Sequence, residues 1–513
     1  MKRVVRGLLA LAALLLVGTL VVFYTPSSPP DSEQRESVLN RSAGGEPESL
    51  DIHKVTSTGA LRVLRDLGEG LLGYSADGKL VPGTAERWEI SDDGREYRFW
   101  IRPQARWSNG DALTAAHFVA GFRRLVDPAT AAIYSRSISV VKNATQILEG
   151  TLPVDRLGVS APEEHLLVVE LEQPVPYFLD LLTHPSMFPI HPGALAEHGD
   201  AFSRPGNYIT NGAYKLDSWQ VGAVVEVSRN DHFHDSANTR IDKVRWLITP
   251  EGMVELNRYR AGELDITDKV PPEAFAAMLE DRPDELRESP YLNVYYYGIN
   301  VTREPFKDNR NLRVALAMAI DRQILVEEVI GRGEEPAYSF VPPGVNNYAA
   351  QKMPFWTMNK QEREDLARQH YRDAGYGPNN PLQVELRYNT SPVHRRIAIA
   401  VQSMWSDVLG VEATLINEDF QVLIANMQAR VVTQVFRSGW GGDYNDAHSF
   451  LQILLSDNPS NLTGYASEEF DGLMATAASQ TNPASRRLYL EESEKAMLRD
   501  QPLAPIYFYV SKH

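Results

Sequence analysis

The chain contains no cysteine among its 513 residues. Disulfides, thiol catalysis, zinc–thiolate centres, iron–sulfur clusters and a lipid anchor on cysteine are therefore excluded. A chain of this length can bury enough apolar surface to fold without disulfides. It is also too long for one compact core, and two or three lobes are expected.

An excess of positive charge is also missing, as are the common catalytic motifs. The chain carries 51 basic and 67 acidic side chains, whereas a general nucleic-acid binder would show a basic surface. There is no H-E-x-x-H, no G-x-S-x-G and no Walker A motif, and no spacing joins Ser, His and Asp into a triad. We therefore expect no nucleic-acid partner and no cofactor, and an exported hydrolase is the less favoured class.

Two short motifs are more typical of turns than of sites. Residues 68–73 spell G-x-G-x-x-G, but a helical pattern precedes them where a dinucleotide site needs a strand, which predicts a helix end. His232 and His234 would share one face of a strand and could bind a metal. No third ligand is evident, however, and their context favours a turn.

The N-terminus has the pattern of an export signal. Three basic residues among the first six precede a charge-free, mostly apolar run over 7–24. Residues 1–27 are predicted to be either a signal peptide, whose cleavage leaves a soluble exported protein, or an uncleaved helix that tethers the chain to the membrane. Residues 28–49 are rich in Pro, Ser, Glu and Gly, which predicts a flexible linker.

From residue 50 onward, strand-like and helix-like segments alternate. Polar and apolar residues alternate over 96–102, and a β-branched run covers 431–436, as in strands. Apolar residues recur at helical spacing over 312–330 and 393–409. This alternation predicts an α/β fold.

The stretch that follows the predicted strand 431–436 carries the clearest functional signal. Arg437 and Asp443 lie six residues apart at the strand end, where they are placed to bind the two ends of a zwitterion. Glycines 441 and 442 let another backbone come close, and the strand offers main-chain groups for pairing. These features predict capture of a peptide rather than bond breaking.

Several distinctive sequence segments occur in a characteristic order along the chain. They include Ala105-Arg-Trp-Ser-Asn-Gly110, Thr210-Asn-Gly-Ala-Tyr-Lys215, Asn257-Arg-Tyr-Arg-Ala-Gly262 and Gly442-Asp-Tyr-Asn445. On these segments the chain resembles the bacterial periplasmic oligopeptide-binding proteins, extracellular solute-binding proteins (family 5) of peptide ABC importers. The resemblance covers nearly the whole body of the chain, from about residue 50 to 510.

The resemblance implies an α/β, three-lobed clamp of the type II periplasmic-binding fold, peptide-binding subclass, with a two-strand hinge. Lobe I would comprise residues 45–68, 193–292 and the C-terminus. Lobe II would comprise 69–192, and lobe III 293–505. The peptide would lie enclosed between lobes I and III.

The resemblance also implies roles for individual residues. Asp443 matches an aspartate that pairs with the peptide's α-ammonium, Arg437 and His394 match residues that receive its carboxylate, and Arg303 lies near a further basic position. The other matched positions pair with the peptide backbone or contact its side chains: Thr56, Ser57, Thr58, Ser438, Gly439, Trp440, Phe420, Tyr134, Tyr507 and Tyr509.

Each of these residues has a structural alternative. Asp443 could cap a turn, and Arg437 could form an ion pair with Asp443 or Asp446. His394 could be an exposed side chain without a role. The aromatic residues could belong to the core.

Two departures from the family concern the site. Some relatives carry a disulfide where this chain has Asn293 and Gly441, so packing alone would hold the loop after residue 440. The segment 56–58 is Thr-Ser-Thr rather than a mixture of acidic and apolar residues, which leaves open any selectivity for basic side chains.

Together these observations predict a monomeric periplasmic receptor that is not an enzyme. It would capture short peptides and deliver them to the permease subunits of an ABC transporter in the inner membrane. The alternative is a binding protein of the same fold for murein peptides or another, non-peptide solute.

Overall fold

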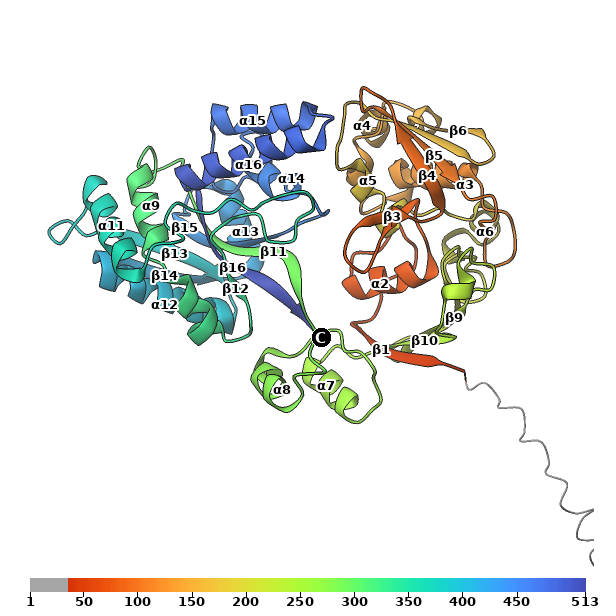
Figure 1. The fold of residues 1–513 in the computed structure, drawn as a ribbon, viewed down its shortest axis with the longest axis horizontal. Coiled ribbons are helices and arrows are strands. Elements are labelled where there is room, and N and C mark those ends of the chain that lie inside the picture. Colours follow the sequence, from red (N-terminus) through yellow and green to blue (C-terminus); the bar gives the residue numbers. More distant parts are fainter. Residues whose placement is uncertain (1–35) are drawn as a thin grey trace, which may run out of the picture.

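The computed structural model describes residues 36–513, so the predicted signal at 1–27 lies outside the described residues. The chain is divided between two bodies that face each other (Figure 1). One body contains two four-stranded sheets, and the other is built on a six-stranded sheet. Between residues 36 and 513, no helix has the length and apolar character needed to cross a membrane.

Lobe I is the sheet with strand order β1-β10-β9-β8 and the helices beside it. Its core joins Val63 and Leu64 of helix α2 to Val225 and Trp246 of the sheet, all of them buried. The elements of lobe I are β1 (Val38–Gly44), α2 (Thr58–Leu67), α6 (Pro192–His198), β8 (Tyr214–Gln220), β9 (Val224–Arg229), β10 (Lys243–Ile248), α7 (Gly252–Arg260) and α8 (Phe275–Asp281).

The prediction of a linker over 28–49 is wrong for residues 38–44, which form strand β1. This strand runs parallel to β10, with Val38 opposite Lys243 and Ser42 opposite Leu247. Its sequence is mostly polar or small, so local composition resembles that of a linker. The strand forms because a distant segment supplies its hydrogen-bond partners, which a local pattern does not reveal.

Lobe II is the sheet with order β4-β5-β7-β6, the hairpin β2-β3 and three helices. Phe99 of the sheet and Phe118 and Phe122 of helix α3 are fully buried in its core. The elements are β2 (Leu72–Tyr74), β3 (Leu80–Pro82), β4 (Ala85–Ile90), β5 (Glu96–Ile101), α3 (Ala115–Val126), α4 (Ala144–Leu148), β6 (Val159–Glu163), β7 (Leu166–Glu170) and α5 (Phe178–Leu181).

Lobe III is the sheet with order β12-β16-β11-β15-β13-β14 and its covering helices. It has the largest core of the described residues, in which Tyr295, Tyr297, Phe306 and Trp405 are buried. The elements are β11 (Glu288–Ile299), α9 (Arg310–Met318), α10 (Arg322–Ile324), β12 (Glu335–Pro336), α11 (Lys360–Asp373), β13 (Gln383–Asn389), α12 (Pro392–Leu409), β14 (Glu412–Glu418), α13 (Phe420–Ala429), β15 (Val435–Gly441), α14 (His448–Leu451), α15 (Glu468–Ser479), α16 (Pro483–Asp500) and β16 (Leu503–Lys512).

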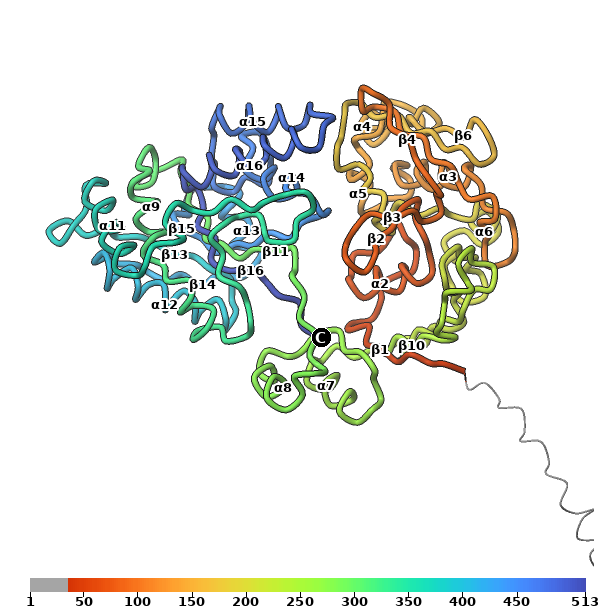
Figure 2. The backbone as a smooth tube through the Cα atoms, in the orientation of Figure 1, coloured from red at the N-terminus to blue at the C-terminus, as the bar shows by residue number. Residues whose placement is uncertain are grey.

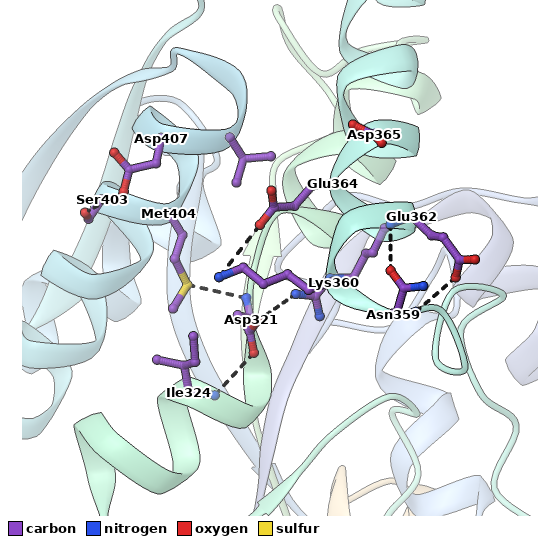
Figure 3. A network of polar contacts seen from close by, with 12 residues as sticks. Asp321, Ile324, Asn359, Lys360, Glu362, Glu364, Asp365, Ser403, Met404 and Asp407 are labelled. Atoms are coloured by element: carbon purple, nitrogen blue, oxygen red, sulfur yellow. Dashed lines mark hydrogen bonds and ion pairs between the residues drawn. The ribbon is translucent and has the colours of Figure 1, made fainter.

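The single helix expected over 312–330 is interrupted at Asp321 (Figure 3). The Asp321 carboxylate accepts from the N–H of Ile324 at 3.2 Å and from the guanidinium of Arg363 at 2.8 Å. Its own N–H donates to the sulfur of Met404 at 3.4 Å. A π-helical turn, Leu325–Ile330, follows. The apolar spacing continues through the break, so periodicity alone could not reveal it.

Strands β11 and β16 join the two bodies. They pair antiparallel from Gly298 opposite Leu503 to Glu288 opposite Lys512, and their far ends reach helices α7 and α8 (Figure 2). The expected two-strand hinge is confirmed. Both strands also belong to the sheet of lobe III, so the C-terminal strand contributes mainly to that lobe. Only its end contacts lobe I, where Val270 N–H donates to Lys512 O at 3.0 Å.

The loop after residue 440 is held by more than packing. Asn293 of β11 lies opposite Gly441 of β15, and Gly442 N–H donates to Leu292 O at 2.8 Å. The indole N–H of Trp440 donates to Ser449 O at 2.7 Å. Hydrogen bonds of the main chain and of the Trp440 indole therefore hold this loop.

This register makes a disulfide testable. A Cβ added at Gly441 would lie 3.3 Å from Nδ2 of Asn293, so the two side chains point toward each other. We predict that the Asn293→Cys/Gly441→Cys variant forms a disulfide and gains about 2–4 kcal/mol in the free energy of unfolding. Urea unfolding with and without reductant measures this, and the two single variants are controls. Thiols that stay free in the double variant would contradict the register.

Candidate functional site

Strand β15 starts four residues later than the sequence pattern predicts. It covers Val435–Gly441, whereas Val431 is 70 % exposed and lies before it. On one side β15 pairs with β11 along its whole length. On the other side β13 pairs only with Val435 and Phe436. Within residues 36–513, the outer edge of β15 beyond Phe436 therefore has no strand partner, and an extended chain could pair there.

A cavity of about 480 Å³ lies beside this open edge. It brings together six of the predicted site residues, from α13, β15 and β16. They are Phe420, Arg437, Ser438, Gly439, Trp440 and Tyr509. Aromatic rings and polar groups both face this space, which suits a ligand with varied side chains.

Arg437 projects from β15 as a cation without an anion. Its guanidinium donates to Asn389 Oδ1 at 3.3 Å and to the Tyr509 hydroxyl at 3.2 Å, and it lies 4.8 Å from the centroid of the Tyr295 ring. Among residues 36–513 no carboxylate pairs with it, and its buried Nε has no hydrogen-bond partner. Burial acts to lower the pKa of Arg437, but the nearby tyrosines Tyr295, Tyr509 and Tyr507 raise it. The side chain stays charged and can receive a carboxylate.

His394 lies near the start of α12, close to the same tyrosines. Its ring centroid is 5.5 Å from that of Tyr295, which in turn stacks on Tyr507 at 4.7 Å. Burial and the positive charge of Arg437 lower the pKa of His394 to about 4. The imidazole is neutral at pH 7, and its Nδ1 has no partner among the described residues. It can therefore hydrogen-bond to a bound group.

Asp443 lies two residues beyond the end of β15, outside the lining of the 480 Å³ cavity, and carries an unpaired carboxylate. Its main-chain N–H donates to Ser449 Oγ at 2.8 Å, while its carboxylate forms no hydrogen bond or ion pair within residues 36–513. Burial raises its pKa. The alternative of an ion pair between Arg437 and Asp443 or Asp446 is wrong, because Asp446 pairs with Arg486 at 2.6 Å.

Tyr134 of lobe II lies within electrostatic reach of Asp443. Its ring is 4.4 Å from that of His184. Burial raises the pKa of Tyr134, and the negative charges of Asp443 and Glu48 raise it further. Residues of all three lobes therefore approach one another around this hydroxyl.

Glu48 already occupies the lobe I segment that was expected to pair with a peptide backbone. Its carboxylate accepts from the N–H groups of Thr56 and Ser57 and from both hydroxyls. Ser57 caps helix α2, and Thr58 is its first residue. The segment is thus a helix start rather than a strand, and its two N–H groups are free for a ligand only when Glu48 leaves.

Arg303 lies apart from these residues. Its guanidinium donates to Val431 O, and it lines a separate groove of about 510 Å³ with Glu385 and Arg387. The structure does not bring Arg303 to the cavity of Arg437.

Sequence reasoning missed three residues that shape the site. Tyr295 stacks against Arg437, Asn389 orients it, and Glu48 occupies the lobe I donors. Tyr295 could have been found from strand periodicity, since it lies two residues from Tyr297, the direct partner of Arg437. No sequence signal ties Glu48 to Ser57.

The two weak motifs have structural roles. Gly68 ends helix α2, its N–H donating to Leu64 O at 2.8 Å. His234 Nε2 contacts Glu69 at 2.9 Å. In the part of the chain from 36 onward, no three His, Cys, Asp or Glu residues gather so as to hold a metal.

A clamp whose two bodies are joined by two strands, with an open strand edge and unpaired charges, defines a solute-binding protein. The family model described as bacterial extracellular solute-binding proteins, family 5 (middle), matches residues 79–461. The chain belongs to this family.

Curated relatives cover almost the whole chain. The periplasmic oligopeptide-binding protein OppA of Salmonella typhimurium is 37 % identical over 93 % of this chain and 88 % of its own. The periplasmic murein peptide-binding protein MppA of Escherichia coli is 36 % identical over 97 % and 92 %. YgiS of the same species, a probable deoxycholate-binding periplasmic protein, is 35 % identical over 98 % and 93 %.

Solved structures show how the bodies are arranged. The unliganded open form of MppA matches with a TM-score of 0.88 and 35 % identity, over 93 % of this chain and 92 % of the other. The complex of Haemophilus influenzae OppA with the peptide RPPGFSPFR matches with a TM-score of 0.70 and 34 % identity, over 93 % and 94 %. The two bodies of this chain are therefore placed as in the open form.

The lowered pKa of His394 predicts a pH effect on stability. As pH falls from 7 to 5, the unfolded chain protonates this histidine and the folded chain does not, so the folded state loses stability. With solvent screening of a half-buried ring, we expect His394→Gln to reduce this loss by about 1 kcal/mol. Urea unfolding at both pH values measures it, with exposed His232→Gln as the control. Equal losses in the wild type and His394→Gln would contradict a neutral His394.

Proposed function

We propose that this chain is an extracytoplasmic receptor that captures short peptides between its two bodies and delivers them to an ABC transporter permease. The observation that carries the proposal is the open edge of β15, bordered by an unpaired Arg437 and an unpaired Asp443. A peptide added along this edge would pair through its main chain, which every sequence shares.

The two charges fit the two ends of a free peptide. Asp443 would bind the α-ammonium, and Arg437 with His394 would receive the carboxylate, a group that a guanidinium binds through two parallel hydrogen bonds. The unpartnered Nε of Arg437 and Nδ1 of His394 are polar atoms that a ligand would complete.

Side chains of the peptide would be accepted with little discrimination. Phe420 and Trp440 line a cavity of about 480 Å³ that also has polar walls, so water can fill the space that a small side chain leaves. Tyr134, Tyr507 and Tyr509 would contact the ligand as the bodies close, and Arg303 would act only on a ligand that extends beyond the cavity.

The names of relatives support a peptide ligand and define the alternative. Relatives are named for oligopeptide binding, and one solved neighbour is a complex with the peptide RPPGFSPFR. MppA is named for murein peptides and YgiS for deoxycholate. A murein peptide would still use Asp443 for its ammonium, with a changed carboxylate partner.

The remaining properties follow from the receptor role. The protein would act in the periplasm, either free after cleavage of residues 1–27 or tethered by them. It would be monomeric, would need no cofactor and would catalyse no reaction. The ligand would stabilise the closed state, and the permease would recognise that state.

Removing the charge of Asp443 tests the ammonium end. Asp443→Asn should weaken binding of a free-amine tetrapeptide by about 2–5 kcal/mol, because the ammonium would lose the partner with which it is buried when the clamp closes. Isothermal titration calorimetry measures the affinity. The N-acetylated peptide is the matched control, for which wild type and variant should bind alike. Unchanged affinity for the free amine would refute the assignment.

Arg437 allows the corresponding test at the other end. Arg437→Gln should lower the affinity for a peptide with a free carboxylate by about 2–5 kcal/mol and leave its C-terminal amide unaffected. Glu385 of the separate groove offers a control, since Glu385→Gln should bind both peptides as the wild type does. An equal loss for acid and amide would assign Arg437 a structural role instead.

A further inference from the structure

Lobe II touches lobe III next to Asp443. The ring of Tyr177, the residue before α5, stacks on Tyr444 with centroids 4.4 Å apart and planes inclined by 7°. It also stacks on His448, with centroids 4.8 Å apart and an inclination of 22°. Helices α5 and α14 lie on the facing sides of the two bodies, away from the crossing strands β11 and β16 (Figure 1). The two bodies are therefore in contact at a second place, even in the open arrangement.

The loop that receives Tyr177 is a single hydrogen-bonded unit. The Tyr444 hydroxyl contacts Nδ1 of His448 at 2.9 Å. The Asp446 carboxylate accepts from both terminal guanidinium nitrogens of Arg486, at 2.6 and 2.9 Å, and from the N–H of His448 at 2.8 Å. Because Tyr444 directly follows Asp443, the stack positions the main chain that carries this carboxylate.

Among residues 36–513, neither Arg437 nor His394 makes such a contact with lobe II. The contacts of Arg437 described above, with Asn389, Tyr509 and Tyr295, all lie within lobe III. Those of His394 are with Tyr295 and with Ser391 at the start of its own helix. In the described part of the chain, the Asp443 end of the site thus lies beside the contact between lobes II and III, whereas Arg437 lies against the joining strands β11 and β16.

A rotation that keeps both the joining strands and the Tyr177 stack in place runs about the line through those two places. Here one place is the crossing of β11 and β16, and the other is the Tyr177 stack. Asp443 adjoins the stack, and Arg437 contacts the joining strands β11 and β16, so both lie near this line, where rotation displaces atoms least. In the open arrangement, after the larger effect of burial, the negative charge of Asp443 already raises the pKa of Tyr134 in lobe II.

We propose that Tyr177 is a positioning residue for Asp443. It holds the 443–448 loop against lobe II, so the anchor for the peptide's α-ammonium is assembled before the clamp closes. Closing then brings lobe I over the bound peptide. This inference rests on the proposed function.

The test compares peptides with and without the ammonium. We would measure the association rate constant from the tryptophan fluorescence of the full chain, using one tetrapeptide as free amine and as N-acetyl derivative. Tyr177→Ala should slow association of the free amine by about 3- to 10-fold, the effect of losing one aromatic stack. It should leave the N-acetyl peptide within about twofold, and Tyr177→Phe, which keeps the stack, should restore wild-type rates. Tyr376→Ala is the matched control, since it removes a tyrosine stack on Tyr371 inside lobe III.

The outcomes distinguish failure of the role of Tyr177 from failure of the proposed function. Equal slowing of both peptides by Tyr177→Ala would make the residue merely structural and overturn the inference. So would wild-type rates for Tyr177→Ala when Asp443→Asn abolishes binding. If Asp443→Asn itself leaves binding unchanged, the proposed function has failed. Should Tyr177→Ala not fold, Tyr177→Leu keeps the apolar volume, removes the aromatic face and carries the same expectation.

Discussion

The structure depends on the pairing of strand β11 with its two neighbours. On one side Tyr295 lies opposite Gly439 of β15, and on the other opposite Tyr507 of β16. The strand that crosses between the bodies thus also supplies the ring on which Arg437 rests. A slip of one residue would turn Tyr295 and Tyr297 to the opposite face of the sheet. Hinge and site are set by one register, so they cannot vary independently.

Elements with a strong period were predictable from the sequence, and those set by distant partners were not. Helix α12 and strand β5 stand close to where their apolar spacing predicts them. Strand β1 was missed because its hydrogen bonds come from β10. Strand β15 was placed too early because Val431 and Val432 have strand propensity but are exposed. Propensity is local, whereas burial is decided by what packs against the segment.

The candidate site likewise contains residues that the sequence identified and contacts that it did not. Arg437, Asp443 and the tyrosines could be named because they stand in distinctive motifs. The motifs did not reveal which hydrogen-bond and charge partners each side chain has in the absence of a ligand. The surroundings of Arg437 depend on contacts between segments far apart in the chain, and even the nearer contact of Glu48 with the donors of Thr56 and Ser57 follows no sequence motif. Arg303 could also bind a carboxylate, but it lies in a groove separate from the cavity of Arg437, which its sequence position did not reveal.

The unpaired charges explain why closing would need a ligand. In the open arrangement, water reaches Asp443 and the outer part of Arg437, so neither bears the full cost of burial. Closing the bodies would remove that water, and desolvating an ion without a partner costs several kcal/mol. The empty clamp is therefore biased toward the open form. Under the proposed roles of Asp443 and Arg437, a zwitterionic ligand would reverse this bias by bringing an ammonium to Asp443 and a carboxylate to Arg437 as the water leaves. Its preference for the closed form would then be set by the two charge pairs, and a ligand that supplied only one of them would leave the other charge to oppose closure.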